Sequence, residues 1–304
     1  MLRDAFPADR YHRGKELVAI EAAADRVTAR FADGSSAQAE LIVGADGLRS
    51  TVRQQFLPDV RPIYAGYVAW RGLVSESTLP PASLRDLFPY FAFCLPPGEQ
   101  MLGYPVAGPD NDLRPGHRRY NFVWYRPAEE ETELRRLLTD ETGHTHSLSI
   151  PPPLIASGSV AEMRSHGERV LAPQFQELLR VTEQPFLQPI YDLESTRMAF
   201  SRVALIGDAA FVARPHVGGG VAKAAHDAMV LAEALSAETD IAAALRRFET
   251  QRIAMGRRIV DRARRLGSYM RTRFNTADER ALAERHQTPE AVMGETALLT
   301  FLRE

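Results

Sequence analysis

Two segments of this chain share one local design, in which a short apolar strand leads into a Gly/Asp turn and then into a helix. The first spans residues 41–53 and reads LIVGADGLRSTVR. The second has its apolar run at residues 202–206, turns at residues 207–210 and continues through Pro215 and Gly218–Gly220 into a helix. Strands this apolar suit a sheet that is covered on both faces. The pair therefore predicts an α/β fold with both turns at the carboxyl ends of strands, where such sheets bind ligands.

The residue types at these turns favour a ligand that has hydroxyl groups and a flat ring. A short Asp at a strand end accepts hydrogen bonds from ligand hydroxyls, and glycine lets the backbone approach a ring because no Cβ intervenes. The helix that follows Gly218–Gly220 offers free N–H groups and the positive end of its dipole to negative charge. A reduced flavin, anionic at N1 and O2, fits this description. Each feature alone is common, so only their combination is informative.

The segments before residue 61 predict a hairpin followed by a short helix. Apolar and polar residues alternate over Val27–Phe31 and Ala37–Leu41, on either side of an Asp-Gly pair, as in a β-hairpin. The second strand is expected to continue through Val43. Ser50 is expected to cap a helix over Thr51–Phe56. We assign residues 1–60 to the first part of the α/β domain.

Residues 61–195 differ in composition from the segments on either side, because aromatic residues are concentrated in their first half. Stretches such as Tyr120–Tyr125 predict strands rich in aromatic and β-branched residues, and helical spans are expected near residues 129–138 and 158–180. We interpret this block as an inserted, mainly antiparallel β domain that binds the substrate. Residues 196–304 return to the α/β domain and end in helices.

Composition narrows the class of protein. The 304 residues suffice for one large α/β unit or two modest domains. The 37 basic and 39 acidic residues give a net charge of −2, which argues against a dedicated nucleic-acid binder. Arginines between residues 246 and 265 are interpreted as a solvated helix face rather than an RNA- or membrane-facing one. No apolar run approaches the ~18 residues of a membrane span, and no signal peptide is evident, so a cytoplasmic location is expected.

Metal and hydrolase chemistry are not expected. Cys94 is the only cysteine, which excludes an intramolecular disulfide and multi-cysteine metal sites, and its apolar neighbours indicate a packed core thiol. His144 and His146 have no further ligand at metal-binding spacing, so a loop pair is favoured over a metal site. The serines lack the strand-to-helix turn of a hydrolase nucleophile.

Together and in this order, the motifs resemble the second and third fingerprints of the FAD-dependent aromatic hydroxylases, the group A flavoprotein monooxygenases. Residues 44–53 resemble the Asp-Gly motif of that family, and residues 207–220 resemble its Gly-Asp motif. The resemblance extends over essentially the whole chain. Four further stretches are similar to the 2,6-dihydroxypyridine 3-monooxygenase branch of the family: residues 66–72, 103–106, 121–126 and 214–224.

The resemblance implies an FAD site and the residues that form it. Asp208 would bind the ribityl chain. Asp46 and Gly47 would lie near the pyrophosphate. Pro215 would lie beside the isoalloxazine, and the backbone of Gly218–Gly220 would face the N1/O2 edge of that ring.

The same resemblance gives Leu17 a backbone contact with the adenine. At three positions the chain departs from the general family pattern, with Phe211 in place of a frequent His, Gly219 in place of Gln and Ala222 in place of Asn. These departures fit the dihydroxypyridine branch. They also remove side-chain contacts that the general pattern would supply.

The implied activity is hydroxylation of an electron-rich aromatic or N-heteroaromatic ring, with FAD as cofactor and NADH or NADPH as transient reductant. His216 would be the catalytic base that deprotonates a ring hydroxyl, or else a structural loop histidine. Trp70, Tyr104 and Tyr125 are candidates for the lining of the substrate pocket. The expected partners are a small aromatic substrate and O₂, with no nucleic acid and no membrane, and a homodimer is one open arrangement.

One part of the family pattern is missing from the sequence. Family members begin with a strand–Gly-x-Gly-x-x-Gly–helix unit that holds the FAD pyrophosphate, and that motif does not occur in these 304 residues. The expected fold is therefore an incomplete FAD-binding Rossmann-like domain with the inserted β domain and C-terminal helices. A fragment that lacks its N-terminal segment is favoured over a natural short form. The alternative function is that of a non-catalytic α/β protein that does not retain FAD.

Overall fold

The structure is a computed structural model that describes residues 2–270, 274 and 276–298. The described chain forms two compact units. The first unit comprises residues 2–63 and 192–263, and the second comprises residues 64–191 and 264–298. The chain opens with two short helical turns, α1 (Leu2–Ala5) and the 3-10 helix η1 (Ala8–Arg10).

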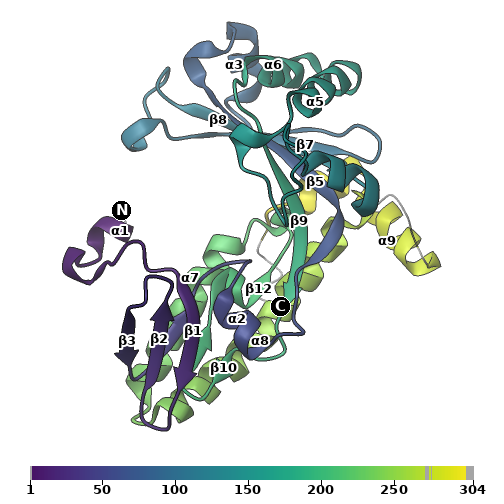
Figure 1. The fold of residues 1–304 in the computed structure, drawn as a ribbon. Helices are drawn as coiled ribbons and strands as arrows, with labels where there is room; N and C mark the ends of the chain where they lie inside the picture. Colours follow the sequence, from purple (N-terminus) through teal and green to yellow (C-terminus); the bar gives the residue numbers. More distant parts are fainter. Residues whose placement is uncertain (1, 271–273, 275, 299–304) are drawn as a thin grey trace. The chain divides into compact units, whose positions relative to one another are not determined.

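The first unit contains an antiparallel three-stranded sheet of β1 (Leu17–Ala22), β2 (Val27–Phe31) and β3 (Ser36–Ala39), drawn in purple in Figure 1. Val27 pairs with Ala39, which confirms the predicted hairpin. Gly34 has φ +82°, a conformation that glycine adopts without strain at the turn. The prediction that the second strand continues through Val43 is wrong. β3 ends at Ala39, and the residues that follow join another sheet.

That other sheet has the order β10 (Ala199–Phe200), β11 (Val203–Leu205), β4 (Ile42–Gly44). β11 and β4 run parallel, with Leu205 opposite Gly44, so the two Gly/Asp turns that follow these strands are neighbours in space. All three residues of β11 are fully buried. Their side chains pack in one core with the helices α2 (Thr51–Phe56), α7 (Gly220–Ala237) and α8 (Ile241–Leu266).

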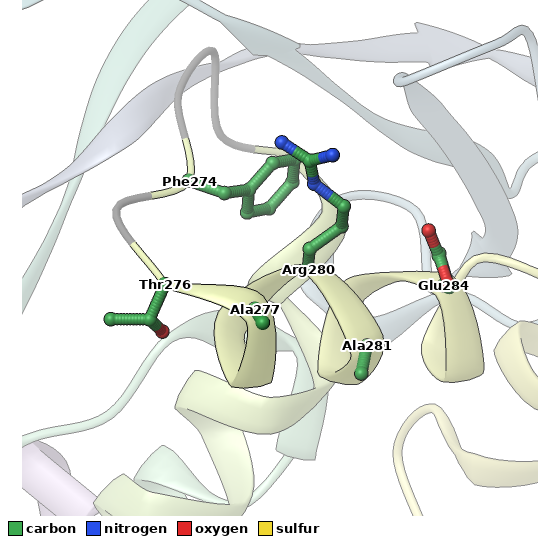
Figure 2. Close-up of a pocket in the computed structure, with 6 residues that line it drawn as sticks. All are labelled: Phe274, Thr276, Ala277, Arg280, Ala281 and Glu284. Carbon is green, nitrogen blue, oxygen red and sulfur yellow. The ribbon is translucent and has the colours of Figure 1, made fainter.

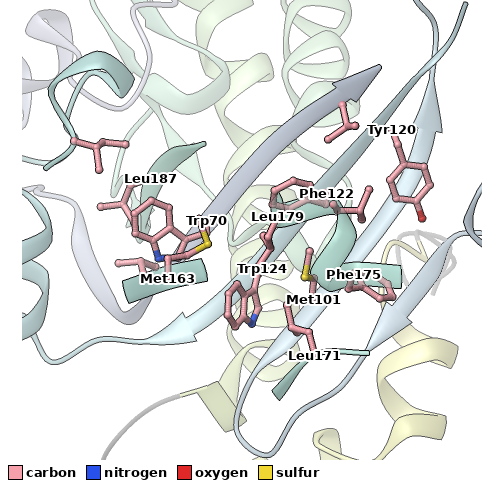
Figure 3. Packing of buried hydrophobic residues seen from close by; sticks show 14 of the residues in the cluster. Trp70, Met101, Tyr120, Phe122, Trp124, Met163, Leu171, Phe175, Leu179 and Leu187 are labelled. Atoms are coloured by element: carbon pink, nitrogen blue, oxygen red, sulfur yellow. The ribbon is translucent and has the colours of Figure 1, made fainter. Parts of the chain in front are cut away.

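The second unit is built on a long antiparallel sheet with the strand order β9-β5-β8-β7-β6. Trp70 and Trp124 are paired across β5 and β8 and are almost completely buried, together with aromatic and aliphatic side chains of the helices (Figure 3). The aromatic crowding seen in the sequence is therefore mainly a core. The strands are β5 (Ile63–Ser75), β6 (Ala92–Cys94), β7 (Gln100–Val106), β8 (Arg119–Pro127) and β9 (Phe186–Glu194).

Helices of the second unit fall where the sequence predicted helical spans, with differences in detail. The span near residues 158–180 is two helices, α5 (Ser157–Val170) and α6 (Pro173–Val181), because Pro173 starts a new helix. The span near residues 129–138 is a π-helical turn (Glu130–Leu134) followed by α4 (Arg135–Leu137). The remaining helices of the unit are α3 (Pro81–Leu87), α9 (Ala277–His286) and α10 (Pro289–Glu295).

The described residues of the stretch 264–298 belong to the second unit, whereas the sequence predicted that residues 196–304 as a whole belong to the α/β domain. Tyr269 and Met270 pack in one core with Tyr67 and Tyr125 of the sheet, on the face opposite Trp70. α9 and α10 contribute Ala283 and Val292 to that core. The sheet thus buries both faces, which a pattern of local hydrophobicity does not reveal.

Candidate functional site

The candidate site begins where β11 ends. The 3-10 turn η6 (Gly207–Ala209) follows the strand, and Gly207 has φ +60°, which favours glycine. The next residue, Asp208, is exposed, so its carboxylate is accessible at the strand end. Partial burial of the carboxyl group raises the pKa of Asp208, the ammonium of Lys223 opposes that rise, and Asp227 adds to it.

The loop that follows leads directly into the N-terminus of α7. Pro215 begins a 3-10 turn (η7, Pro215–Val217), and Gly218 takes a left-handed conformation at φ +63°. Gly219 precedes the first helical residue and no side chain caps this end, so the first N–H groups of α7 remain available to a ligand. The exposed carboxylate can accept hydrogen bonds from ribityl hydroxyls, and the N–H groups of the uncapped helix N-terminus can donate to an anionic flavin edge.

In the first Gly/Asp turn, the Asp46 carboxylate makes its hydrogen bonds to the start of the helix that follows. Asp46 Oδ1 accepts a hydrogen bond of 2.5 Å from the Ser50 hydroxyl, and Oδ2 accepts one of 3.2 Å from the backbone of Val52. Ser50 also caps α2 by accepting from Arg53 N, as predicted. Gly47 has φ +72° and turns the chain between strand and helix. Asp46 therefore fixes the start of α2, and its part in binding a pyrophosphate stays a prediction.

Arg53 ties the two turns together, a role that the sequence analysis missed. Its guanidinium is almost fully buried and donates to Leu48 O at 2.5 Å in the first turn and to Ala209 O at 3.0 Å in the second. Burial lowers the pKa of Arg53, and Asp46 opposes that shift. Its place at the end of the first motif was visible in the sequence, but its partner in the second motif was not.

A buried ion pair fixes the start of the Pro215 loop. Arg214 donates to both oxygens of Asp192, with Nε 3.0 Å from Oδ1 and Nη2 2.8 Å from Oδ2. Both side chains are at most 5% exposed. His216, two residues further on, is also buried, and burial together with the positive charge of Arg214 lowers its pKa to about 3. His216 is therefore a neutral imidazole at neutral pH.

A second buried cluster holds the Gly207 turn against α7 and α8. Asp227 accepts from the backbone of Gly207 at 3.0 Å through Oδ2 and from Arg252 Nε at 2.7 Å through Oδ1. Lys223 Nζ lies 3.7 Å from the same Oδ2. The sequence analysis missed Asp227 and Arg252. The spacing of Lys223 and Asp227, four residues apart on one helix face, was the available signal.

The substrate candidates do not all share one face of the second unit. Tyr125 is buried on the face that also holds Tyr67, with ring centroids 6.0 Å apart, and Tyr104 packs partly buried against that same core. Trp70 lies on the opposite face in the helix-covered core. The structure thus groups Tyr104 with Tyr125 and separates Trp70 from both. In the first unit, Leu17 begins β1, and its backbone pairs with Phe31.

Among the pockets of the described residues, the one between α7 and α8 includes a predicted site residue, Gly219, whereas the pocket beside α9 includes none. A pocket of about 380 Å³ in the second unit is lined by Phe274, Thr276 and one face of α9, including Arg280 and Glu284 (Figure 2). His146 Nε2 lies 2.9 Å from Asp140 Oδ2. Within residues 2–270, 274 and 276–298, no cluster of three or more His, Cys, Asp or Glu has metal-binding geometry, and no helix has the length and apolar character to cross a bilayer.

Two family models match most of the chain. One, described as an FAD binding domain-like family, covers residues 64–192, and the other, described as an FAD binding domain, covers residues 189–263. The mixed α/β fold, its antiparallel sheets and its C-terminal helices agree with these matches. The fold and the matches define the class, that of flavoproteins with an FAD-binding domain.

Similarity to curated proteins defines the class of flavoprotein more closely. The chain is 33% identical over 88% of its length to 2,6-dihydroxypyridine 3-monooxygenase of Paenarthrobacter nicotinovorans, of which it covers 66%. It is 30% identical over 98% of its length to 3-amino-4-hydroxybenzoate 2-monooxygenase of Streptomyces cremeus, again covering 66% of the relative. The FAD-dependent urate hydroxylase of Klebsiella pneumoniae is 32% identical over 86% of the chain, which covers 60% of that protein.

Comparison with solved structures leads to the same group of hydroxylases. 2,6-Dihydroxypyridine-3-hydroxylase from Arthrobacter nicotinovorans superposes with a TM-score of 0.83 at 31% identity, over 90% of this chain and 69% of that one. Klebsiella pneumoniae HpxO, in complex with FAD and uric acid, gives a TM-score of 0.69 at 28% identity, over 96% of this chain and 68% of that one. The chain belongs to the family of FAD-dependent aromatic hydroxylases. It spans 60–66% of the length of the three curated relatives.

Proposed function

We propose that this chain serves an FAD-dependent monooxygenase that hydroxylates an electron-rich aromatic or N-heteroaromatic ring with NADH or NADPH and O₂. The observation that carries the proposal is the junction of β11 and α7. There the exposed carboxylate of Asp208 and the uncapped N-terminus of α7 follow a strand that pairs in parallel with the strand of the other Gly/Asp motif. The hydroxylases and monooxygenases among the relatives support the same reaction class.

Bound FAD would supply the redox chemistry, and the chain would supply binding and orientation. Asp208 would accept hydrogen bonds from ribityl hydroxyls. The N–H groups at the start of α7 would stabilise negative charge at the ring edge. The Arg214–Asp192 pair keeps the intervening loop in place, so that neither element has to be ordered when the cofactor binds.

His216 would accept the proton of a ring hydroxyl during oxygen transfer. A neutral imidazole can accept a proton, but a pKa near 3 makes it a weak base toward a neutral phenol. The negative charge that remains on the deprotonated ring would stabilise the imidazolium, because an opposite charge within ~4–6 Å favours the charged form. The base function therefore depends on substrate lying against His216.

The test compares this chain with a chimera in which a strand–Gly-x-Gly-x-x-Gly–helix segment, of the kind with which members of the family begin, precedes residue 1. Each is mixed with FAD, NADH or NADPH, ¹⁸O₂ and a panel of hydroxylated pyridines and benzoates. We expect the chimera to bind FAD and at least one compound to accelerate NAD(P)H oxidation, with one ¹⁸O atom in the product. A chimera that binds FAD yet incorporates no ¹⁸O into any compound contradicts the proposal.

A further inference from the structure

A small pocket of about 190 Å³ lies between α7 and α8 in the first unit. Ala222, Met255 and Ile259 form apolar parts of its wall, and the polar side chains among its described lining residues are Lys223, His226 and Arg252. All three are basic. The volume is below the ~300–1,000 Å³ of sites for drug-sized ligands, so the pocket suits a compound of only a few heavy atoms.

The ammonium of Lys223 is buried without a hydrogen-bond acceptor. Its side chain is 1% exposed, and Nζ has no hydrogen-bond partner within the described residues. The nearest carboxylate oxygen, Oδ2 of Asp227, is 3.7 Å away and already accepts from Gly207 N. Leaving a buried donor unsatisfied is unfavourable, and more so when it is charged, so a ligand that supplies an acceptor to Nζ is bound more tightly.

The donors around the pocket are not balanced by acceptors. Asp227 is shared between Lys223 and Arg252, and its Oδ1 is taken by Arg252 Nε at 2.7 Å. Arg252 Nη1 lies 3.1 Å from His226 Nδ1 and donates to it, so Nε2 of that ring carries a proton and offers another donor. A ligand that complements this lining carries negative charge at one end and hydrocarbon at the other.

We propose that the pocket between α7 and α8 binds a small organic monocarboxylate with a short apolar tail. The carboxylate accepts hydrogen bonds from Lys223 and Arg252, and the tail packs on Met255 and Ile259. The pocket borders the predicted cofactor site, because Gly219 lines it and Asp208 acts electrostatically on Lys223. Butyrate binding is measured without FAD, so its failure is distinguishable from failure of the proposed function.

Binding is expected to take up a proton. Burial lowers the pKa of Lys223, although Asp227 and Asp208 oppose the shift, and Arg252 adds to it. A carboxylate bound beside Nζ favours the ammonium form and raises that pKa again. Among the described lining residues, His226 and Arg252 are the other basic side chains that face the pocket. Affinity should therefore fall as the pH rises through the pKa of Lys223.

The test titrates butyrate into the full chain by calorimetry, at constant ionic strength set with sodium chloride. We expect one butyrate per chain and at least tenfold weaker binding by Lys223→Met. The matched control is Lys15→Met, because Lys15 is the only other lysine of the chain and lies at the surface beside Asp33. 1-Butanol, which has the tail without the charge, should not bind. Equal affinity of the chain and Lys223→Met, or binding of butanol as tight as butyrate, overturns the proposal.

A second measurement on the unchanged chain covers the case that Lys223→Met does not fold. Selective ¹³C labelling of lysine gives two Cε resonances, because the chain has two lysines. Butyrate should shift the resonance of Lys223 and leave that of Lys15 in place. Equal shifts of both, or none, contradict the proposed site.

Discussion

At the residue scale, three buried arginines hold the candidate site together. Arg53, Arg214 and Arg252 are each at most 2% exposed. The planar guanidinium donates in several directions at once, so one side chain can connect two loops, as Arg53 does for residues 156 positions apart. No local pattern in the sequence predicts such a role, because the partner is brought in only by the fold. The turns were predictable from their glycines and aspartates, and the groups that brace them were not.

Arg214 offers a direct test of this bracing. Replacing Arg214 by Met leaves Asp192 as a buried charge without its guanidinium, and breaking a buried pair in this way typically costs about 3–5 kcal/mol. We expect the free energy of unfolding, measured in urea, to fall by that amount. The control is Arg26→Met, since the Arg26–Asp25 pair is exposed and should leave stability almost unchanged. Equal effects of the two substitutions count against the bracing role.

Asp208 should matter for FAD and not for the fold. In the chimera, Asp208→Ala is expected to weaken FAD binding by about 1.5–3 kcal/mol, the range for a hydrogen bond to a charged group. Stability should be retained because the side chain is exposed at the end of β11. Fluorescence titration of FAD measures the effect, and Asp59→Ala, an exposed carboxylate elsewhere in the first unit, serves as control. Unchanged affinity removes Asp208 from the cofactor site.

His216 should make the stability of the chain sensitive to acid. Its pKa is about 3 in the folded state, against ~6.5 when unfolded, so between these values only the unfolded chain binds the proton. Folding stability should fall by about 1.4 kcal/mol for each pH unit below ~6.5 through this group alone. His216→Asn should flatten the profile between pH 6 and 4 by that slope. Urea unfolding at each pH checks it, and parallel profiles would show that His216 is not held neutral.

At the scale of elements, the ends of the strands could not be predicted from the sequence alone. The alternation over residues 36–43 looks like one strand, yet β3 ends at Ala39 and β4 pairs with β11. The deciding factor is a parallel partner some 160 positions away, which provides backbone hydrogen bonds that a longer hairpin would forgo. By contrast, the cap of α2 is local, so Ser50 and the extent Thr51–Phe56 were predictable from the sequence.

Gly256 lets α8 approach the strand β12 (Phe211–Val212) closely. A Cβ at this position would lie 2.6 Å from the ring of Phe211, which is itself buried. Gly256→Ala should therefore destabilise the chain by about 1–3 kcal/mol, even though alanine favours a helix by up to ~1 kcal/mol. Gly158→Ala in α5, where a Cβ meets no atom within 4 Å, is the matched control and should stabilise slightly. Thermal unfolding of both variants checks the prediction, which fails if Gly256→Ala is also stabilising.

At the scale of the whole molecule, the boundary between the two units near residue 61 was easier to predict from the sequence than the one near residue 263. The change in amino-acid composition near residue 61 reflects a difference between the two hydrophobic cores. The core around β11 is mainly aliphatic, and the core around β5 and β8 is rich in aromatic residues. The helices after residue 263 look like a continuation of α8 in the sequence. Their membership in the second unit depends on Tyr269 and Met270 reaching the tyrosine-rich face of the sheet, a contact between segments about 200 residues apart.

The whole chain should retain little FAD when it is purified alone. Its described residues offer contacts for the ribityl chain and the ring edge through Asp208 and the start of α7, but its sequence contains no Gly-x-Gly-x-x-Gly motif to hold the pyrophosphate. In the nucleotide-binding folds that use it, this motif aims a helix N-terminus at the charged part of the ligand. We therefore expect a colourless protein, or one with far less than one flavin per chain. Absorbance near ~450 nm, where an oxidised flavin cofactor absorbs, measures this directly. A yellow preparation with one FAD per chain would show that Asp208 and α7, with the rest of this chain, suffice to bind the cofactor.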